Sequence, residues 1–154
     1  MTNDHADADT DESRFLELRL PSKLGYEKIA MDAASALARR LGISNDRIER
    51  LRTALAEAII NAIEHGNGLD AETRVLVVLS ARPDELVVRV ADQGQRPLEL
   101  APIARADRRD QVGGWGIWLI QKLVDEVEFS AAPGGGTQVR MVVHLEHVGG
   151  THAG

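Results

Sequence analysis

A run of five apolar residues, from Val75 to Leu79, constrains the fold of this chain more than any other feature. Successive side chains of a strand point to opposite faces, so a strand over residues 73–80 is apolar on both faces and must be a central strand of a sheet. Residues 81–84 form a turn that contains Pro83, and residues 85–91 predict a second strand. Together the two strands predict a β-hairpin.

Two helices are predicted before this hairpin. Residues 23–41 form the first, and Gly42 stands where a helix C-cap belongs. Its apolar residues recur at helical spacing: Ile29, Ala33, Leu37 and Leu41. The second helix begins at Ser44 or Asn45 and ends near Gly66. Its apolar stripe consists of Ile48, Leu51, Leu55, Ile59 and Ala62.

Three further strands and one further helix complete the expected fold. Residues 15–20 alternate and predict a strand that ends at Pro21, with Leu16, Leu18 and Leu20 on one side. Residues 115–124 predict a short helix, and residues 127–130 and 138–145 predict strands joined by a glycine-rich turn. The last strand should point these side chains inward: Val139, Met141, Val143 and Leu145. We expect an α+β fold, a two-layer α/β sandwich with an approximately five-stranded, mixed but largely antiparallel sheet and about three helices on one face.

The chain of 154 residues fits one domain. Residues 1–13 are acidic and predict a disordered tail, residues 14–147 form the single domain, and residues 148–154 predict a flexible glycine-rich tail. Residues 95–112 show little periodicity and carry four arginines. A connection of this length in a small domain is usually functional.

Composition excludes several classes of function. A net charge of −6 and only 3% aromatic residues argue against binding of nucleic acid or of an anionic membrane. The absence of cysteine excludes a disulfide framework, a thiolate zinc site and a cysteine nucleophile. No apolar run reaches the roughly 18 residues of a membrane span, and the polar N-terminus does not resemble a signal peptide. We therefore expect a cytoplasmic protein.

The second helix carries a polar face opposite its apolar stripe. Glu57 and Asn61 lie four residues apart on this face, which is about 6 Å along the axis, so a carboxylate and an amide can reach one ligand together. A face that only meets water is the alternative interpretation.

Glycines and an aspartate mark three other candidate positions. Asp92 and Gly94 end a strand that otherwise reads as core, which is also consistent with a simple turn. Gly113, Gly114 and Gly116 precede or begin a helix, where backbone N–H groups favour phosphate, although a plain hinge fits as well. Thr137 follows three glycines and opens the last strand, a pattern also typical of a hairpin turn.

The order and spacing of these motifs resemble the Bergerat-fold (GHKL) ATP-binding domain. The string from Leu55 to Gly66 is similar to the N box of one branch, the anti-sigma factor serine/threonine kinases of the RsbW type. The strings 114–120 and 123–127 are similar to the second glycine box of the same branch. The resemblance extends from Phe15 to Leu145.

The resemblance implies a role for each candidate residue. Asn61 would be a ligand of Mg²⁺, and Glu57 would be the general base that accepts a proton from an attacking hydroxyl. Asp92 would accept a hydrogen bond from the adenine amino group, with Gly94 allowing close approach of the base and Thr137 supporting the pocket. The phosphates would lie against the lid end, which comprises these residues: Gly113, Gly114, Trp115 and Gly116.

Some residues depart from the family pattern or allow two interpretations. Arg96 replaces the second glycine of the first glycine box, so the family pattern does not determine the conformation of the lid here. The segment that follows carries arginines that either reach the γ-phosphate or are solvated, the latter being the rule for surface charges: Arg96, Arg105, Arg108 and Arg109. His65 would shape the phosphate end of the pocket or cap the helix, since the chain lacks the dimerisation module of a sensor histidine kinase. Trp115 and Trp118 suit a partner interface, but core packing is favoured for Trp118.

The resemblance implies an ATP- and Mg²⁺-dependent protein serine/threonine kinase. Such a protein would phosphorylate a STAS-domain antagonist, sequester a sigma factor or another regulator by partner switching, and form a homodimer. Partner switching would follow from mutually exclusive binding together with phosphorylation, which adds roughly −1.5 to −2 charge to the contact surface of the antagonist. The alternatives are a catalytically silent binding module gated by nucleotide, and a stand-alone ATPase or histidine-kinase remnant.

Overall fold

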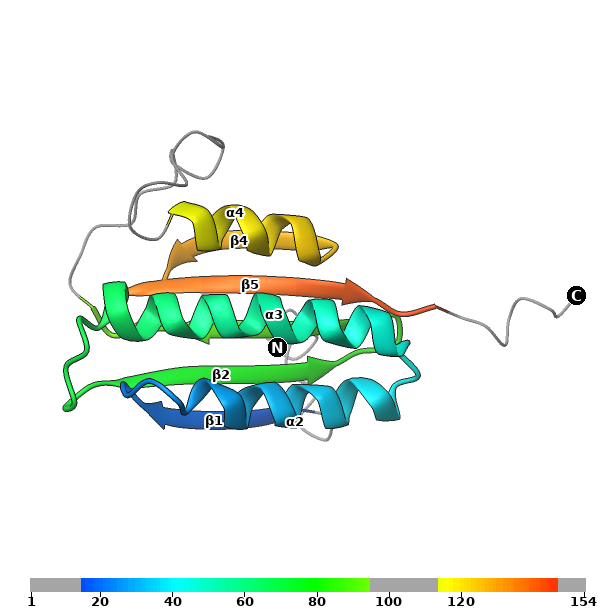
Figure 1. Cartoon of the computed structure of the whole chain (residues 1–154), viewed down its shortest axis with the longest axis horizontal. Helices are drawn as coiled ribbons and strands as arrows, with labels where there is room; N and C mark the ends of the chain where they lie inside the picture. Colours follow the sequence, from blue (N-terminus) through cyan, green and yellow to red (C-terminus); the bar gives the residue numbers. More distant parts are fainter. Residues whose placement is uncertain (1–14, 95–113, 147–154) are drawn as a thin grey trace, which may run out of the picture.

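The computed structural model describes residues 15–94 and 114–146, and Figure 1 shows their arrangement. In chain order the elements are β1 (Phe15–Pro21), α2 (Glu27–Arg40), α3 (Asn45–Asn61), the π-helical turn η2 (Ala62–Gly66), β2 (Arg74–Ala81), β3 (Glu85–Ala91), α4 (Gly114–Leu123), β4 (Glu126–Ala131) and β5 (Thr137–His144). The predicted α+β class is confirmed. The predicted tails (1–13 and 148–154) lie outside the described residues, as do the four arginines between β3 and α4.

The five strands form one sheet in the order β1-β2-β3-β5-β4. Each pair of neighbouring strands is antiparallel, so within the described residues the sheet has no parallel pairing and the predicted mixed component is absent. The helices α2, α3 and α4 cover one face, with α3 in the middle (Figure 1). The hairpin predicted from the apolar run is β2–β3, and it provides the centre of the sheet.

The core lies between α3 and the helix-facing side of the sheet. The apolar stripe of α3 is buried, as predicted, and it packs against alternate residues of the central strands: Val75, Val77, Leu79, Leu86, Val88 and Val90. Met141 and Val143 of β5 complete this layer, with Val139 and Leu145 partly buried at its margin. Within the described chain, no helix has the length and apolar character needed to cross a membrane.

The predicted stripe of α2 lies at the margin of its buried face, where Ala33, Leu37 and Leu41 are partly buried against the core. The fully buried residues are Ala30, Ala34 and Ala38, whereas Ile29 is 51% exposed. Alanine has no bulk beyond Cβ, so this face allows α2 to approach α3 closely, and the larger side chains move to its margin. Leu16 of β1 is likewise exposed, because it lies near the outer end of an edge strand.

The ends of the helices follow their local sequence. Gly42 has a φ of 84°, and its N–H donates to the carbonyl of Arg39 while the N–H of Ile43 donates to that of Ala38, which closes α2 as a Schellman motif. The Ser44 hydroxyl accepts from the N–H of Arg47 at 3.4 Å and caps α3, as predicted. The first helix begins at Glu27 rather than at residue 23, because residues 23–26 turn before it and Gly25 takes a φ of 109°.

Candidate functional site

The C-terminal end of α3 widens into the π-helical turn η2. The N–H of Asn67 donates to the carbonyl of Ala62 at 2.7 Å, a bond that spans five residues. Single π-helical turns of this kind occur frequently at functional sites because they redirect the chain at the end of a helix. Here the turn brings Gly66 against Asp92, the residue that follows β3.

Glu57 and Asn61 lie where α4 crosses this end of α3. A Cβ placed on Gly116, in the first turn of α4, would lie 2.8 Å from Oε1 of Glu57 and 3.1 Å from Nδ2 of Asn61. Any side chain at residue 116 would therefore displace these two polar groups. Both residues are half-buried, so this part of the polar face is not an ordinary solvated helix surface.

Neither polar group is satisfied by the protein. Across residues 15–94 and 114–146, no side chain or backbone group forms a hydrogen bond with the Glu57 carboxylate or the Asn61 amide. The polar atoms of both side chains are still reached by solvent, so water or a ligand can supply the missing hydrogen bonds. A carboxylate and an amide left together in this state are available to a ligand.

Asp92 is 8% exposed, and its two carboxylate oxygens differ. Oδ1 accepts from the N–H of Gly94 at 2.9 Å and from the N–H of Thr137 at 3.1 Å. The backbone N–H of Asp92 donates in turn to the carbonyl of Thr137 at 3.0 Å. Oδ2 has no hydrogen-bond partner among the described residues. The two bonds to Oδ1 fix the carboxylate so that Oδ2, a free acceptor, lies beside Gly66.

Three glycines make room for this carboxylate. A Cβ on Gly66 would collide with Oδ2 of Asp92, one on Gly136 would collide with the Asp92 carbonyl, and one on Gly94 would collide with the Gly66 carbonyl. The segment after α3, the end of β3 and the start of β5 are therefore in close contact around one acidic side chain. Gly66 and Gly136 were not among the predicted site residues, although the glycine clusters that contain them were visible in the sequence.

The remaining predicted residues are placed less closely. His65 is half-buried, and its Nε2 lies 3.8 Å from the neighbouring Glu64 carboxylate. Gly114 and Trp115 begin α4, while Gly113 lies outside the described residues. Trp118 is half-buried with the Lys122 ammonium 5.7 Å from its ring, so the preference for core packing at this position is wrong.

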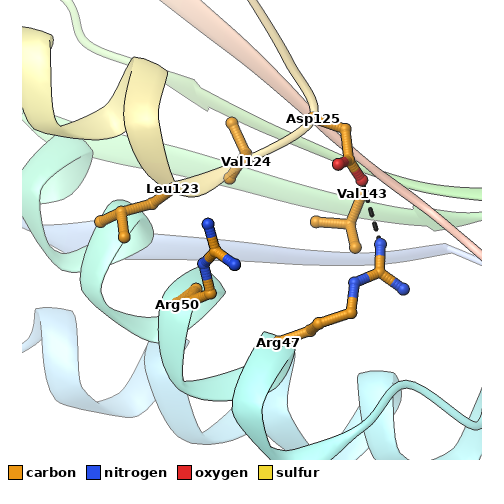
Figure 2. A pocket seen from close by; sticks show the side chains of 6 residues that line it. All are labelled: Arg47, Arg50, Leu123, Val124, Asp125 and Val143. Carbon is orange, nitrogen blue, oxygen red and sulfur yellow. Dashed lines mark hydrogen bonds and ion pairs between the residues drawn. The ribbon is translucent and has the colours of Figure 1, made fainter.

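A hollow at the other end of α3 contains none of the predicted site residues (Figure 2). It is lined by Arg47, Arg50, Leu123, Val124, Asp125 and Val143. Arg47 Nη2 donates to Asp125 Oδ2 at 3.0 Å and to the His144 carbonyl at 2.6 Å, which ties α3 to β5 and to the start of β4. Arg47 stands fourteen residues before Asn61, about 21 Å along the axis, so this hollow is separate from the glycine-lined site.

The pKa of His144, near this hollow and away from the glycine-lined site, is raised above its usual value. Nε2 of His144 lies 2.6 Å from the Glu126 carboxylate, and this hydrogen bond raises the pKa of His144. The carboxylates of Asp125, Glu126 and Glu85 raise the same pKa further, and partial desolvation opposes them. The charge of His144 therefore depends on contacts of β4 and β5 and not on the glycine-lined site.

Comparison with known proteins identifies the family. The family described as histidine kinase-like ATPase domain matches residues 20–143. The chain belongs to this family. Its relatives include the serine-protein kinase RsbW of Bacillus pumilus, 36% identical over 129 residues, and that of Bacillus velezensis, 33% identical over 128 residues. These alignments cover 77% and 78% of this chain and 80% of each relative, so the predicted resemblance to the RsbW type is confirmed.

A solved structure shows the same fold. The crystal structure of the RsbU and RsbW domains of Rv1364c from Mycobacterium tuberculosis matches with a TM-score of 0.63. The match covers 85% of this chain and 32% of that chain, at 20% sequence identity. This likeness supports the arrangement of three helices on a five-stranded antiparallel sheet.

The site fits the ligands that the family implies. An ATPase domain implies binding of ATP, whose base carries an amino group that can donate to a free carboxylate oxygen such as Oδ2 of Asp92. The amide oxygen of Asn61 is a hard ligand of the kind that Mg²⁺ accepts. The close packing of Gly116 on Glu57 and Asn61 keeps the backbone of α4 near both groups.

Proposed function

We propose that this protein is an ATP-dependent serine/threonine protein kinase and an anti-sigma-type regulator. It phosphorylates a STAS-domain antagonist and sequesters a sigma factor or another regulator by partner switching. The observation that carries the proposal is the pair of unpartnered, half-buried groups of Glu57 and Asn61 beneath Gly116. Relatives at 33–36% identity are named serine-protein kinases, which supports the same chemistry here.

In this proposal the adenine end of the site is built around Asp92. Its Oδ2 accepts a hydrogen bond from the adenine amino group, while the N–H groups of Gly94 and Thr137 hold Oδ1. Gly94 also allows the base to approach the backbone. The first turn of α4 contributes Gly114, Trp115 and Gly116 to the phosphate end, together with Gly113, and His65 borders it.

The catalytic end is built around α3. Asn61 would ligate Mg²⁺, and the bound ion would neutralise charge on the phosphates during transfer. Glu57 accepts the proton of the attacking serine or threonine hydroxyl. The hydroxyl oxygen bonds to the γ-phosphorus as the bond to ADP breaks and ADP leaves. A carboxylate without a competing hydrogen bond is suited to this role, because its acceptor oxygens remain available.

Two further features belong to the proposal by family likeness. A homodimer would present two such sites, and addition of a phosphate to the antagonist would weaken its contact with this acidic protein through like charge. The rival function is a catalytically silent binding module in which nucleotide only sets the conformation of the lid. The unpartnered Glu57 carboxylate favours the kinase, because a silent module has no use for a free base.

The test is transfer of labelled γ-phosphate from Mg-ATP to the STAS-domain protein encoded nearest in the genome. We expect label on a serine or threonine of that protein with the wild-type chain, and its loss by orders of magnitude with Glu57→Gln and Asn61→Ala. Glu49→Gln is the matched control, because Glu49 lies on the same helix but is exposed. ATP binding by Glu57→Gln without loss of transfer would contradict the role of Glu57, and binding without any transfer would favour the silent module.

A further inference from the structure

Asn67 is a buried polar residue that the roles above do not use. It is 6% exposed and follows directly after the π-helical turn. Its Nδ2 donates to Ser22 Oγ at 2.8 Å and to the carbonyl of Arg74 at 3.1 Å, and its Oδ1 accepts from the N–H of Gln93 at 2.7 Å. One short side chain therefore joins the segment after α3 to β2, to the segment after β1 and to the segment after β3.

Gln93 completes this network from the opposite side. Its Oε1 accepts from the N–H of Arg74 at 2.6 Å, while Asn67 Nδ2 donates to the carbonyl of Arg74. The backbone pairing of β2 with β3 ends at Leu76 and Ala91, two residues before this point. Side chains thus replace the missing rungs of the ladder where the chain leaves the sheet.

The network surrounds the residue proposed to recognise adenine. Gln93 stands between Asp92 and Gly94, and its N–H is fixed by Asn67. The Asp92 carboxylate is fixed from the other side by Gly94 and Thr137. The direction of Oδ2 therefore depends on two sets of bonds, one from Gly94 and Thr137 to Oδ1 and one from Gln93 to Asn67.

We infer that Asn67 is a positioning residue that sets the base specificity of the nucleotide site. This inference rests on the proposed function, because it assumes that Oδ2 of Asp92 accepts from the amino group of the base. Asn67 does not touch the base. It holds Gln93, and hence the Asp92–Gly94 backbone, in the position that keeps the free oxygen of Asp92 beside Gly66.

The experiment compares the affinities of ATP and inosine triphosphate, whose base carries an oxo group where adenine carries the amino group. The wild-type chain should bind ATP at least about tenfold more tightly, since a carboxylate oxygen repels the oxo group. Asn67→Ala should reduce this ratio by about three- to tenfold. Asn67→Asp, which keeps the acceptor for Gln93 and loses the bonds that Nδ2 donates to Ser22 and Arg74, should give a smaller reduction.

Ser35→Ala is the matched control for lost stability. Ser35 is 5% exposed and forms partly buried hydrogen bonds with the Met31 carbonyl and with Arg52, away from the site. It should lower the melting temperature and leave the ATP to inosine triphosphate ratio unchanged. An unchanged ratio in both Asn67 variants, with ATP still preferred by the wild type, would overturn the positioning role alone. A wild-type chain that binds neither nucleotide, or both equally, would overturn the proposed recognition by Asp92 and this inference together.

Discussion

The two ends of α3 show opposite ways of treating polar groups. At the N-terminal end, Arg47 and Asp125 are joined to each other and to the backbone of β5, so each of these two charges has a partner. At the C-terminal end, the described chain leaves Glu57, Asn61 and one oxygen of Asp92 without hydrogen bonds. This difference supports the proposal that one end of α3 serves stability and the other binds a ligand.

Removal of the free acceptor oxygen of Asp92 should have the largest effect on nucleotide binding at the C-terminal end of α3. Asp92→Asn keeps an oxygen for the N–H groups of Gly94 and Thr137 but places a donor where the adenine amino group would donate. We expect ATP affinity to fall by about 100-fold, as measured by titration calorimetry. Asp84→Asn, at an exposed turn, should leave it unchanged.

Filling the space beneath α4 should have the next largest effect. Gly116→Ala places a methyl group 2.8 Å from Oε1 of Glu57, so the carboxylate must move. We expect phosphotransfer to fall by about tenfold or more while the protein stays folded, as measured by label transfer and circular dichroism. Gly134→Ala is a suitable control, because a Cβ there meets nothing within 4 Å. Equal rates in the two variants would argue against a tight arrangement at residue 116.

A change at the opposite end should act on stability alone. Arg47→Ala removes bonds to Asp125 and to the His144 carbonyl, from a side chain that is 23% exposed. We expect the free energy of unfolding to fall by about 1–2 kcal/mol in chemical denaturation. ATP affinity should stay within about twofold of the wild type. A large loss of affinity would show that the two ends are coupled.

The smallest effect concerns pH. The pKa of His144 is raised in the folded state, chiefly by its hydrogen bond to Glu126. The stabilisation is therefore complete below the unfolded pKa of about 6.5 and is lost as the pH rises through the folded value. We expect the melting temperature of the wild type to fall slightly more than that of His144→Gln when the pH is raised from 6 to 8. A steeper fall in the variant would contradict the direction of the shift.

Much of the fold could be predicted because periodicity reports burial directly. The apolar run in β2 and the stripe of α3 each identified their element, and Gly42 and Ser44 identified helix ends. The stripe of α2 was misplaced because alanines carry little hydrophobic signal, yet they form its contact with α3. Hydrophobic periodicity shows where large apolar side chains recur, and it does not show how closely two backbones approach.

The candidate site could be predicted from the sequence where a family motif requires particular residue types at set spacings. Glu57, Asn61 and Asp92 were predicted in this way, and the structure places Glu57 and Asn61 together beneath α4. Asn67 was missed because its role comes from bonds to Ser22, Arg74 and Gln93, which are distant in sequence. Such a network arises only when the turn after α3 and the end of β3 meet in the folded chain.

The most direct test is to titrate the isotope-labelled protein with Mg-ATP and follow its backbone amide signals by nuclear magnetic resonance. The account predicts shifts concentrated at Gly66, Gly94, Gly116 and Thr137, with little change around Arg47, Arg50 and Asp125. Shifts centred on the hollow at the N-terminal end of α3, or no saturable shifts, would contradict the claim that the unpartnered groups at the C-terminal end of α3 form the nucleotide site.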